Sequence, residues 1–167
     1  DATITTWGIR KGLTEEFARA VLEDRKGRVW VATSDGLFAI TAATVKHYGR
    51  EQGLVSGAVL SLAEDAGGTL WVGTNGGGIH RLVGDRFDVQ SDELGIAVVP
   101  VRAILPARDG TLWVGTSTGL VRGSWKKPVP PRVMRLGDGL PSDQVSALYE
   151  DRSGRLWVGT RGGLGVM

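Results

Sequence analysis

The chain has 167 residues, of which 41% are hydrophobic, so it is long enough for one domain with a real core. Its 20 Lys and Arg residues nearly balance 18 Asp and Glu residues, and a net charge of +2 argues against an electrostatic nucleic-acid binder. Eighteen consecutive apolar residues occur nowhere, so we expect no membrane span and no direct membrane contact, and the absence of cysteine excludes disulfides and thiolate metal sites.

The first predicted element in chain order is an outer strand, Thr3–Trp7 (TITTW). Trp7 stands six residues before Leu13, as Tyr48 stands six residues before Leu54. After it, one phrase built on Trp-Val occurs four times, centred on Trp30, Trp71, Trp113 and Trp157, at intervals of 41, 42 and 44 residues. A fixed period of this length is typical of a repeat architecture.

Each repeat predicts a small antiparallel sheet. In the fourth, a β-prone run (Val145–Tyr149) leads through an Asp-x-x-Gly turn (Asp151–Gly154) into a second strand (Arg155–Thr160). A Gly-rich break precedes a third strand, and in the other repeats a fourth run follows. Four strands joined by short loops form one propeller blade, and no segment has a helical period, so the predicted fold class is an all-β propeller.

The repeats divide the chain into an outer strand of a split blade, three complete blades and a last blade without its outer strand. These parts are residues 1–12, 13–53, 54–95, 96–139 and 140–167. Blades of about forty residues usually close in rings of six to eight, so we expect this segment to be part of a larger ring. Its missing neighbours would be further blades of the same polypeptide or, for the isolated chain, a second copy joined head to tail as a homodimer, each first strand completing the other's last blade.

The repeated residues have a predicted structural role. Along each strand Trp shares a face with a small residue two positions on, and we expect that small residue to leave room for a Trp of the neighbouring blade. The small residues are Gly73, Gly115 and Gly159, with Ala32 in the first repeat. Small residues also recur in the first strand, at Ala20, Ser61, Ala103 and Ala147, as crowding near a propeller axis requires. We therefore interpret the four tryptophans as core residues; the alternative is a binding platform for sugars or bases.

The stretch GLPSDQVSALYEDRSGRLWVGTRGGL, from Gly139 to Leu164, resembles the two-component regulator propeller repeat. The second repeat matches through Gly53, Leu54, Glu64, Asp65 and Trp71, and the first matches apart from Ala32. The third departs most, because Pro106 and Ala107 replace the Glu-Asp pair. The resemblance implies a periplasmic or other extracytoplasmic sensor propeller of bacterial signalling proteins. In such proteins the propeller typically precedes a membrane span and an output domain, so we expect this chain to be a piece of a longer one.

Function is expected on the loop face, where blade-to-blade loops and the loops between second and third strands gather. The candidate ligand-binding residues are Glu15, Glu16, Asp35, Asn75, Asp143, Gln144 and Arg161. For each of them an ordinary solvated turn residue is the alternative.

Catalytic and metal sites are not favoured. The pairs Glu23–Asp24, Glu64–Asp65 and Glu150–Asp151 could be acid and base, but neighbours along a strand point to opposite faces. We assign Asp24, Asp65 and Asp151 to holding their turns, and each Glu to pairing with a basic neighbour. His47 and His80 are isolated in sequence, which does not favour a metal site, and the glycines of GTNGGGIH (73–80) indicate a hairpin and not a phosphate loop. No cofactor is predicted.

The leading functional hypothesis is a non-catalytic sensor or ligand-binding module. The resemblance implies carbohydrate breakdown products as the ligand class. A propeller lyase or glycan-active enzyme is the second hypothesis, and a protein-interaction scaffold is the third. A cluster of His, Arg and Glu on one loop face would favour the enzyme, whereas scattered small and polar residues favour binding.

Overall fold

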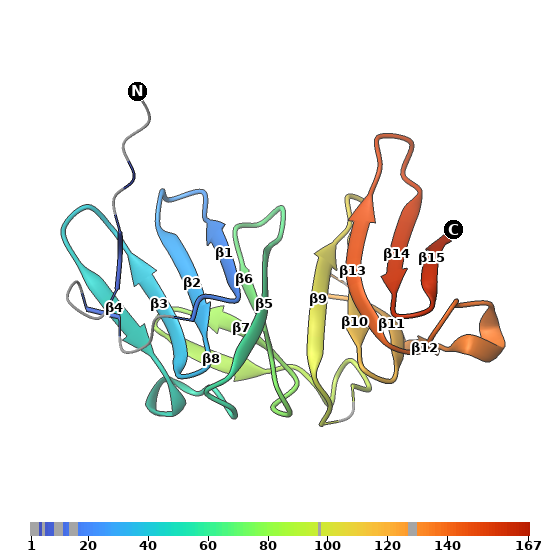
Figure 1. Ribbon diagram of the computed structural model, residues 1–167, viewed down its shortest axis with the longest axis horizontal. Helices are drawn as coiled ribbons and strands as arrows, with labels where there is room; N and C mark the ends of the chain where they lie inside the picture. The colour runs from blue at the N-terminus through green and yellow to red at the C-terminus, as the bar shows by residue number, and fades with distance from the viewer. Residues whose placement is uncertain (1–3, 5, 9–11, 14–16, 97, 127–129) are drawn as a thin grey trace.

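The computed structural model describes residues 4, 6–8, 12–13, 17–96, 98–126 and 130–167, and in these residues every long element is a strand. The strands form four separate antiparallel sheets, each with its strands in sequence order, as Figure 1 shows. The described residues contain two short 3₁₀ turns and no α-helix. The predicted all-β propeller built of repeated blades is therefore confirmed.

The blades follow one another along the chain. The first blade consists of β1 (Ala20–Glu23), β2 (Val29–Thr33), β3 (Gly36–Ile40) and β4 (Val45–Tyr48). The second consists of β5 (Val59–Glu64), β6 (Leu70–Thr74), β7 (Ile79–Val83) and β8 (Arg86–Val89). The third consists of β9 (Val101–Pro106), β10 (Thr111–Thr116), β11 (Gly119–Ser124) and β12 (Arg132–Met134). The fourth has three strands, β13 (Val145–Glu150), β14 (Leu156–Thr160) and β15 (Gly163–Val166).

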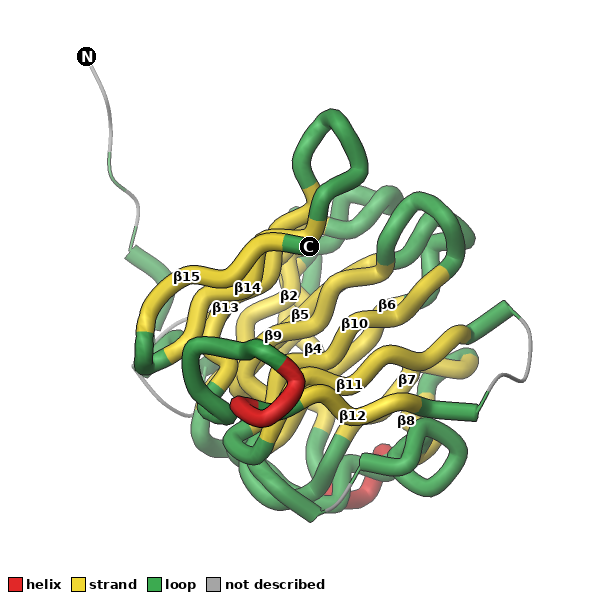
Figure 2. The backbone as a smooth tube through the Cα atoms, turned by 90° about the vertical axis from the view of Figure 1, so that its right-hand side faces the viewer, coloured by secondary structure: helices red, strands yellow, loops and turns green. Residues whose placement is uncertain are grey.

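The first strand of every blade is the innermost one. Strands β1, β5, β9 and β13 contact one another in that order. Figure 1 shows the blades spread from the first at the left to the fourth at the right, and Figure 2 looks onto the fourth. Of the predicted outer strand Thr3–Trp7, the structure describes Ile4, Thr6 and Trp7, and none of these three is in a strand.

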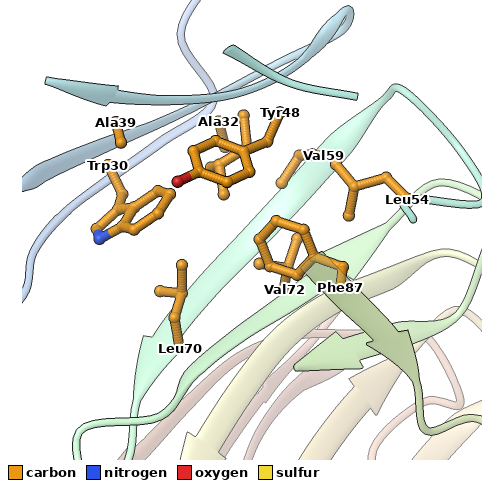
Figure 3. Packing of buried hydrophobic residues seen from close by; sticks show 10 residues of the cluster. Trp30, Ala32, Ala39, Tyr48, Leu54, Val59, Leu70, Val72 and Phe87 are labelled. Carbon is orange, nitrogen blue, oxygen red and sulfur yellow. The ribbon is translucent and has the colours of Figure 1, made fainter. Parts of the chain in front are cut away.

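Each pair of consecutive blades shares a hydrophobic core, and the one between the first two blades is drawn in Figure 3. Trp30 is fully buried there. Its ring lies 5.4 Å from that of Tyr48, which in turn meets Phe87 of the next blade at 5.8 Å between ring centroids. Trp71 is buried in the same way between the second and third blades. The tryptophan face of a blade therefore packs against the blade that follows it.

The small residue two positions after each Trp has a different role from the predicted one. A Cβ on Gly73 would lie 2.5 Å from a methyl group of Val101, and one on Gly115 would lie 2.6 Å from a methyl group of Val145. Both valines begin the first strand of the following blade. The glycines therefore make room for an inner-strand valine and not for a tryptophan, because Trp and Gly share one face and both look toward the next blade.

The Asp-x-x-Gly turns are tied to the tryptophans by hydrogen bonds. The indole Nε1 of Trp30 donates to Asp24 at 2.7 Å, and the other oxygen of Asp24 accepts the amides of Lys26 and Arg28. The same indole-to-carboxylate bond joins Trp71 to Asp65, and Trp157 to Asp151, at 3.0 Å. The bond from Trp157 keeps the pKa of Asp151 well below its usual range, because it stabilises the ionised carboxylate.

The third repeat closes its turn differently. Ala107 stands in place of the turn aspartate, so Trp113 has no carboxylate partner there. Asp109, two residues on, accepts the amide of Thr111 at 2.8 Å and its hydroxyl at 2.9 Å. The carboxylate of Asp109 thus holds this turn in place of the missing aspartate. It does not replace the indole-to-carboxylate bond that the other three repeats have.

Candidate functional site

The two ends of the blades differ in what they offer a ligand. At one end lie the Asp-x-x-Gly turns, which we call the turn face; at the other, which we call the loop face, the loop after each second strand meets the blade-to-blade connection. Backbone bonds fix this meeting: Asn75 donates to Ala58, Ser117 to Pro100 and Arg161 to Gln144, at 2.8–3.1 Å. A rigid blade therefore holds the loops of the loop face in place, as binding loops require.

One hollow of about 670 Å³ opens on the loop face between the third and fourth blades, and we call it hollow A. Its lining comes from three segments: the β10–β11 loop, the 3₁₀ turn η3 (Leu136–Asp138) with the residue before it, and the loop that enters β13. The lining residues are Ser117, Thr118, Arg135, Leu136, Pro141, Ser142, Asp143 and Gln144.

Hydrogen bonds fix the wall of hollow A and leave polar groups facing it. Arg135 donates from Nε to the carbonyl of Thr118 at 3.2 Å, which ties η3 to the neighbouring loop. One oxygen of Asp143 accepts the amide of Leu136 at 2.6 Å. Gln144 is exposed, and its side-chain amide can both donate and accept. Hydrogen bonds thus fix the backbone of the wall at Thr118 and Leu136, while the side-chain amide of Gln144 can serve as donor or acceptor.

An apolar side chain completes hollow A. Leu136 is 62% exposed at its wall and gives the hollow one apolar contact. A surface with one apolar contact among amide, carboxylate and hydroxyl groups suits a ligand that has both C–H faces and hydroxyl groups. The hollow is open and shallow.

A second hollow, which we call hollow B, occupies the equivalent place between the first and second blades. Its volume is about 400 Å³. It is lined by Asp35, His47, Gly49, Arg50, Glu51, Gln52 and Gly57. The ring nitrogen Nε2 of His47 lies 2.6 Å from the carbonyl oxygen of Asp35, so the histidine is already engaged by the wall. Both hollows therefore pair the loop after a blade's second strand with a 3₁₀ turn, here η2 (Arg50–Gln52).

The structure brings only some of the predicted site residues together. Asp143 and Gln144 line hollow A, and Asp35 lines hollow B. Asn75 is exposed on the loop face and the backbone amide of Arg161 donates to Gln144, but neither residue lines hollow A or hollow B. Glu15 and Glu16 lie outside the described residues.

Sequence reasoning missed Arg135 and Leu136. The sequence carries one signal, the Gly-Leu pair that recurs at Gly53 and Gly139. In the structure both glycines have φ near 100° and end the 3₁₀ turns η2 and η3. The residues of η3, which precede Gly139, turn toward the loop face, and Leu136 is the first of them.

In the second repeat, both carboxylates of the turn-face pair accept hydrogen bonds. Asp65 is buried and accepts three hydrogen bonds, whereas Glu64 points away and accepts the backbone amide of Arg25. For Asp24, burial by itself would raise the pKa, but bonds from Trp30, Arg28 and Lys26 outweigh it and lower the pKa. The carboxylates of Asp24 and Asp65 are therefore engaged in holding their turns.

The two histidines lie in separate blades. His80 is fully buried in β7, where its Nε2 accepts the amide of Val55 at 3.1 Å and burial lowers its pKa. The described residues contain no group of three or more His, Asp or Glu side chains arranged to hold a metal ion. Among them no helix is long and apolar enough to cross a membrane either.

The family model of the two-component regulator propeller matches residues 12–35, 53–76, 95–118 and 139–162. This chain belongs to the two-component regulator propeller family. Each matched segment begins at the Gly-Leu or Gly-Ile pair and ends in the loop after the Trp strand, so the four matches correspond to the four blades. The chain matches none of the curated proteins.

Solved structures share the propeller fold. The extracellular domain of the hybrid two-component system BT3049 from B. thetaiotaomicron superposes with a TM-score of 0.80 at 22% identity, covering 93% of this chain and 21% of that one. The extracellular domain of the one-component system BT4673 from the same organism gives 0.79 at 18%, covering 94% and 22%. Virginiamycin B lyase from Staphylococcus aureus gives 0.68 at 16%, covering 93% and 57%. This two-component regulator propeller thus spans about a fifth of the two extracellular domains.

Proposed function

We propose that the chain is a non-catalytic, extracytoplasmic sensor module that binds a carbohydrate on its loop face, at hollow A. Membership of the two-component regulator propeller family supports the sensor role, and the extracellular domains that share its fold support the location. The observation that carries the ligand proposal is hollow A itself, with Leu136 exposed beside the side-chain groups of Asp143 and Gln144.

A carbohydrate fits the chemistry of this hollow. Sugar rings present hydroxyl groups that need donors and acceptors, and C–H faces that pack on an apolar side chain. Gln144 and Asp143 supply the first, and Leu136 supplies the second. The wall is held by the bonds of Arg135 and Asp143, so little ordering would be required on binding.

Calorimetry with a panel of neutral and uronic-acid oligosaccharides tests the proposal. We expect one class of oligosaccharide to bind, and Gln144→Ala and Leu136→Ala each to weaken that binding by about tenfold, as the loss of one well-placed contact does. Ser153→Ala, at an exposed turn on the turn face, is the matched control and should bind like the parent chain. Binding that survives both hollow A variants, or turnover of a bound oligosaccharide, would contradict the proposal.

A further inference from the structure

Two of the three blade-to-blade junctions are joined at the turn face by an Arg and a Glu. At the first junction the backbone amide of Arg25 donates to both carboxylate oxygens of Glu64, at 3.2 and 3.1 Å. The guanidinium of Arg25 then reaches past the carboxylate and donates to the carbonyl of Ala66 at 2.7 Å. We call this arrangement the Arg–Glu clasp.

The third junction repeats the clasp. The amide of Arg108 donates to Glu150 at 3.1 Å, and its guanidinium donates to the carbonyl of Arg152 at 3.4 Å. In both clasps the Nε of the arginine lies 3.9 Å from a carboxylate oxygen. The arginine always follows the first residue of a turn, and the glutamate always ends the first strand of the next blade.

The second junction has neither half of the clasp. Ala66 stands where Arg25 stands one blade earlier, and Pro106 stands where the glutamate would be. Both halves are absent at the same junction, and both are present at the other two. The arginine and the glutamate therefore occur together at a junction or not at all. A blade that carries one of them without the other is expected to lie next to a blade that carries its partner.

Each end of the chain carries one unpaired half. Arg152 holds the arginine position in the fourth blade, and Glu23 holds the glutamate position in the first blade. Both side chains are exposed, and within the described residues neither forms a hydrogen bond or an ion pair. The two blades lie at opposite ends of the molecule in Figure 1, so the two halves do not meet within one copy.

The apolar surfaces beside these half-clasps are also uncovered. Tyr149 and Leu164, on the face of the fourth blade that would look toward a following blade, are 62% and 63% exposed. Leu37, which holds the place of Leu164 in the first blade, is fully buried by the second blade. On the other end, Val21 of β1 is exposed, whereas its equivalent Leu148 packs against the preceding blade.

We propose that, as an isolated polypeptide, this chain associates head to tail as two copies, with the fourth blade of each docked on the first blade of the other. Arg152 of one copy and Glu23 of the other complete the clasp at both new junctions, and Tyr149 and Leu164 become buried between blades. A basic half and an acidic half at opposite ends make this contact complementary in charge, whereas contact between two like ends would bring equal charges together. Two such contacts close the assembly, so it stops at two copies.

Sedimentation velocity of the purified chain at micromolar concentration tests the charge part of the proposal. We expect a dimer, and we expect Glu23→Arg or Arg152→Glu to weaken it by about tenfold or more, since each change sets like charges against each other at both junctions. The double variant, with the two charges exchanged, should regain only part of the loss. The charge attraction returns, but an arginine at position 23 cannot accept the backbone amide that the glutamate accepts in the clasp. Glu93→Arg makes the same charge change at an exposed loop position and should leave the dimer intact.

A gain of affinity tests the packing part. The spaces at Gly73 and Gly115 are filled by Val101 and Val145, but the three atoms nearest to a Cβ on Gly159 all belong to its own blade. The residue that would face Gly159 in the next copy is Ala18, which is exposed here.

Ala18→Val should therefore tighten the dimer by about a hundredfold, because two methyl groups become buried at each of the two junctions. Ala43→Val, also at an exposed alanine, should change nothing. Circular dichroism of every variant separates a folded monomer from an unfolded chain. A parent chain that stays monomeric at micromolar concentration, or a dimer indifferent to the Glu23 and Ala18 variants, would overturn the proposal.

Discussion

Replacing Asp65 by alanine should destabilise the fold far more than the loss of an ordinary turn residue would. Asp65 is 1% exposed and accepts hydrogen bonds from the indole of Trp71 at 3.0 Å and from the amides of Gly67 and Thr69 at 2.8 and 3.0 Å. The buried indole left without an acceptor costs about 1–3 kcal/mol, and each partly buried amide about 1 kcal/mol more. We therefore expect Asp65→Ala to lower the free energy of unfolding by about 3–5 kcal/mol.

Urea denaturation followed by tryptophan fluorescence and by circular dichroism measures this loss. Asp65→Asn is the informative partner variant, because its carbonyl oxygen can still hold the two turn amides while the indole bond is lost; about half of the effect should remain. The third repeat supplies the converse experiment. Ala107→Asp, beside the unpaired Trp113, should raise stability by about 1 kcal/mol. A loss below about 1 kcal/mol in Asp65→Ala would show that the indole bond does not hold the blade together.

Three further changes test the packing of the core and the effect of burying His80. Trp71→Ala should lower the free energy of unfolding by about 3–5 kcal/mol in a urea titration, as truncation of a buried aromatic side chain does. An unchanged urea midpoint would favour the alternative that the tryptophans form a ligand-binding platform. Gly115→Val should cost about 1–3 kcal/mol or more by the same assay, because its Cβ would lie 2.6 Å from a methyl group of Val145; a neutral result would contradict the close blade contact. Burial holds the pKa of His80 below 6.5, so the unfolded chain binds more protons, and stability that is present above pH 6.5 should fall as the pH drops below it. Thermal melts between pH 5 and 7.5 measure this, and His80→Phe, which matches Phe38 of the first blade, should remove the slope.

The blades could be predicted from the sequence because each blade is formed by residues that lie close together in the chain. The Trp phrase, the Asp-x-x-Gly turn and the Gly-rich break all lie within about twenty residues, and the alternation of faces along a strand follows from strand geometry alone. The hydrogen bond from Trp30 to Asp24 also joins residues only six positions apart, so it could have been predicted from one repeat.

The contacts between blades could not be predicted in the same way. Which residue fills the space at Gly73 depends on how two sheets are offset, and Val101 lies 28 residues further on. The Arg–Glu clasp joins Arg25 to a residue 39 positions away, and no pattern in one repeat reveals that reach. Hollow A depends on the turn made by η3, and no pattern within one repeat shows that Leu136 is exposed there.

The position of the ligand on the blades tests the central claim most directly. A titration of the ¹⁵N-labelled chain with the oligosaccharide that binds in calorimetry reports, amide by amide, where the ligand lies. The account predicts shifts concentrated at the loop face around Thr118, Leu136 and Gln144, with the turns at Asp24 and Asp65 unaffected. Shifts centred on those turns, or spread evenly over the Trp strands, would contradict it.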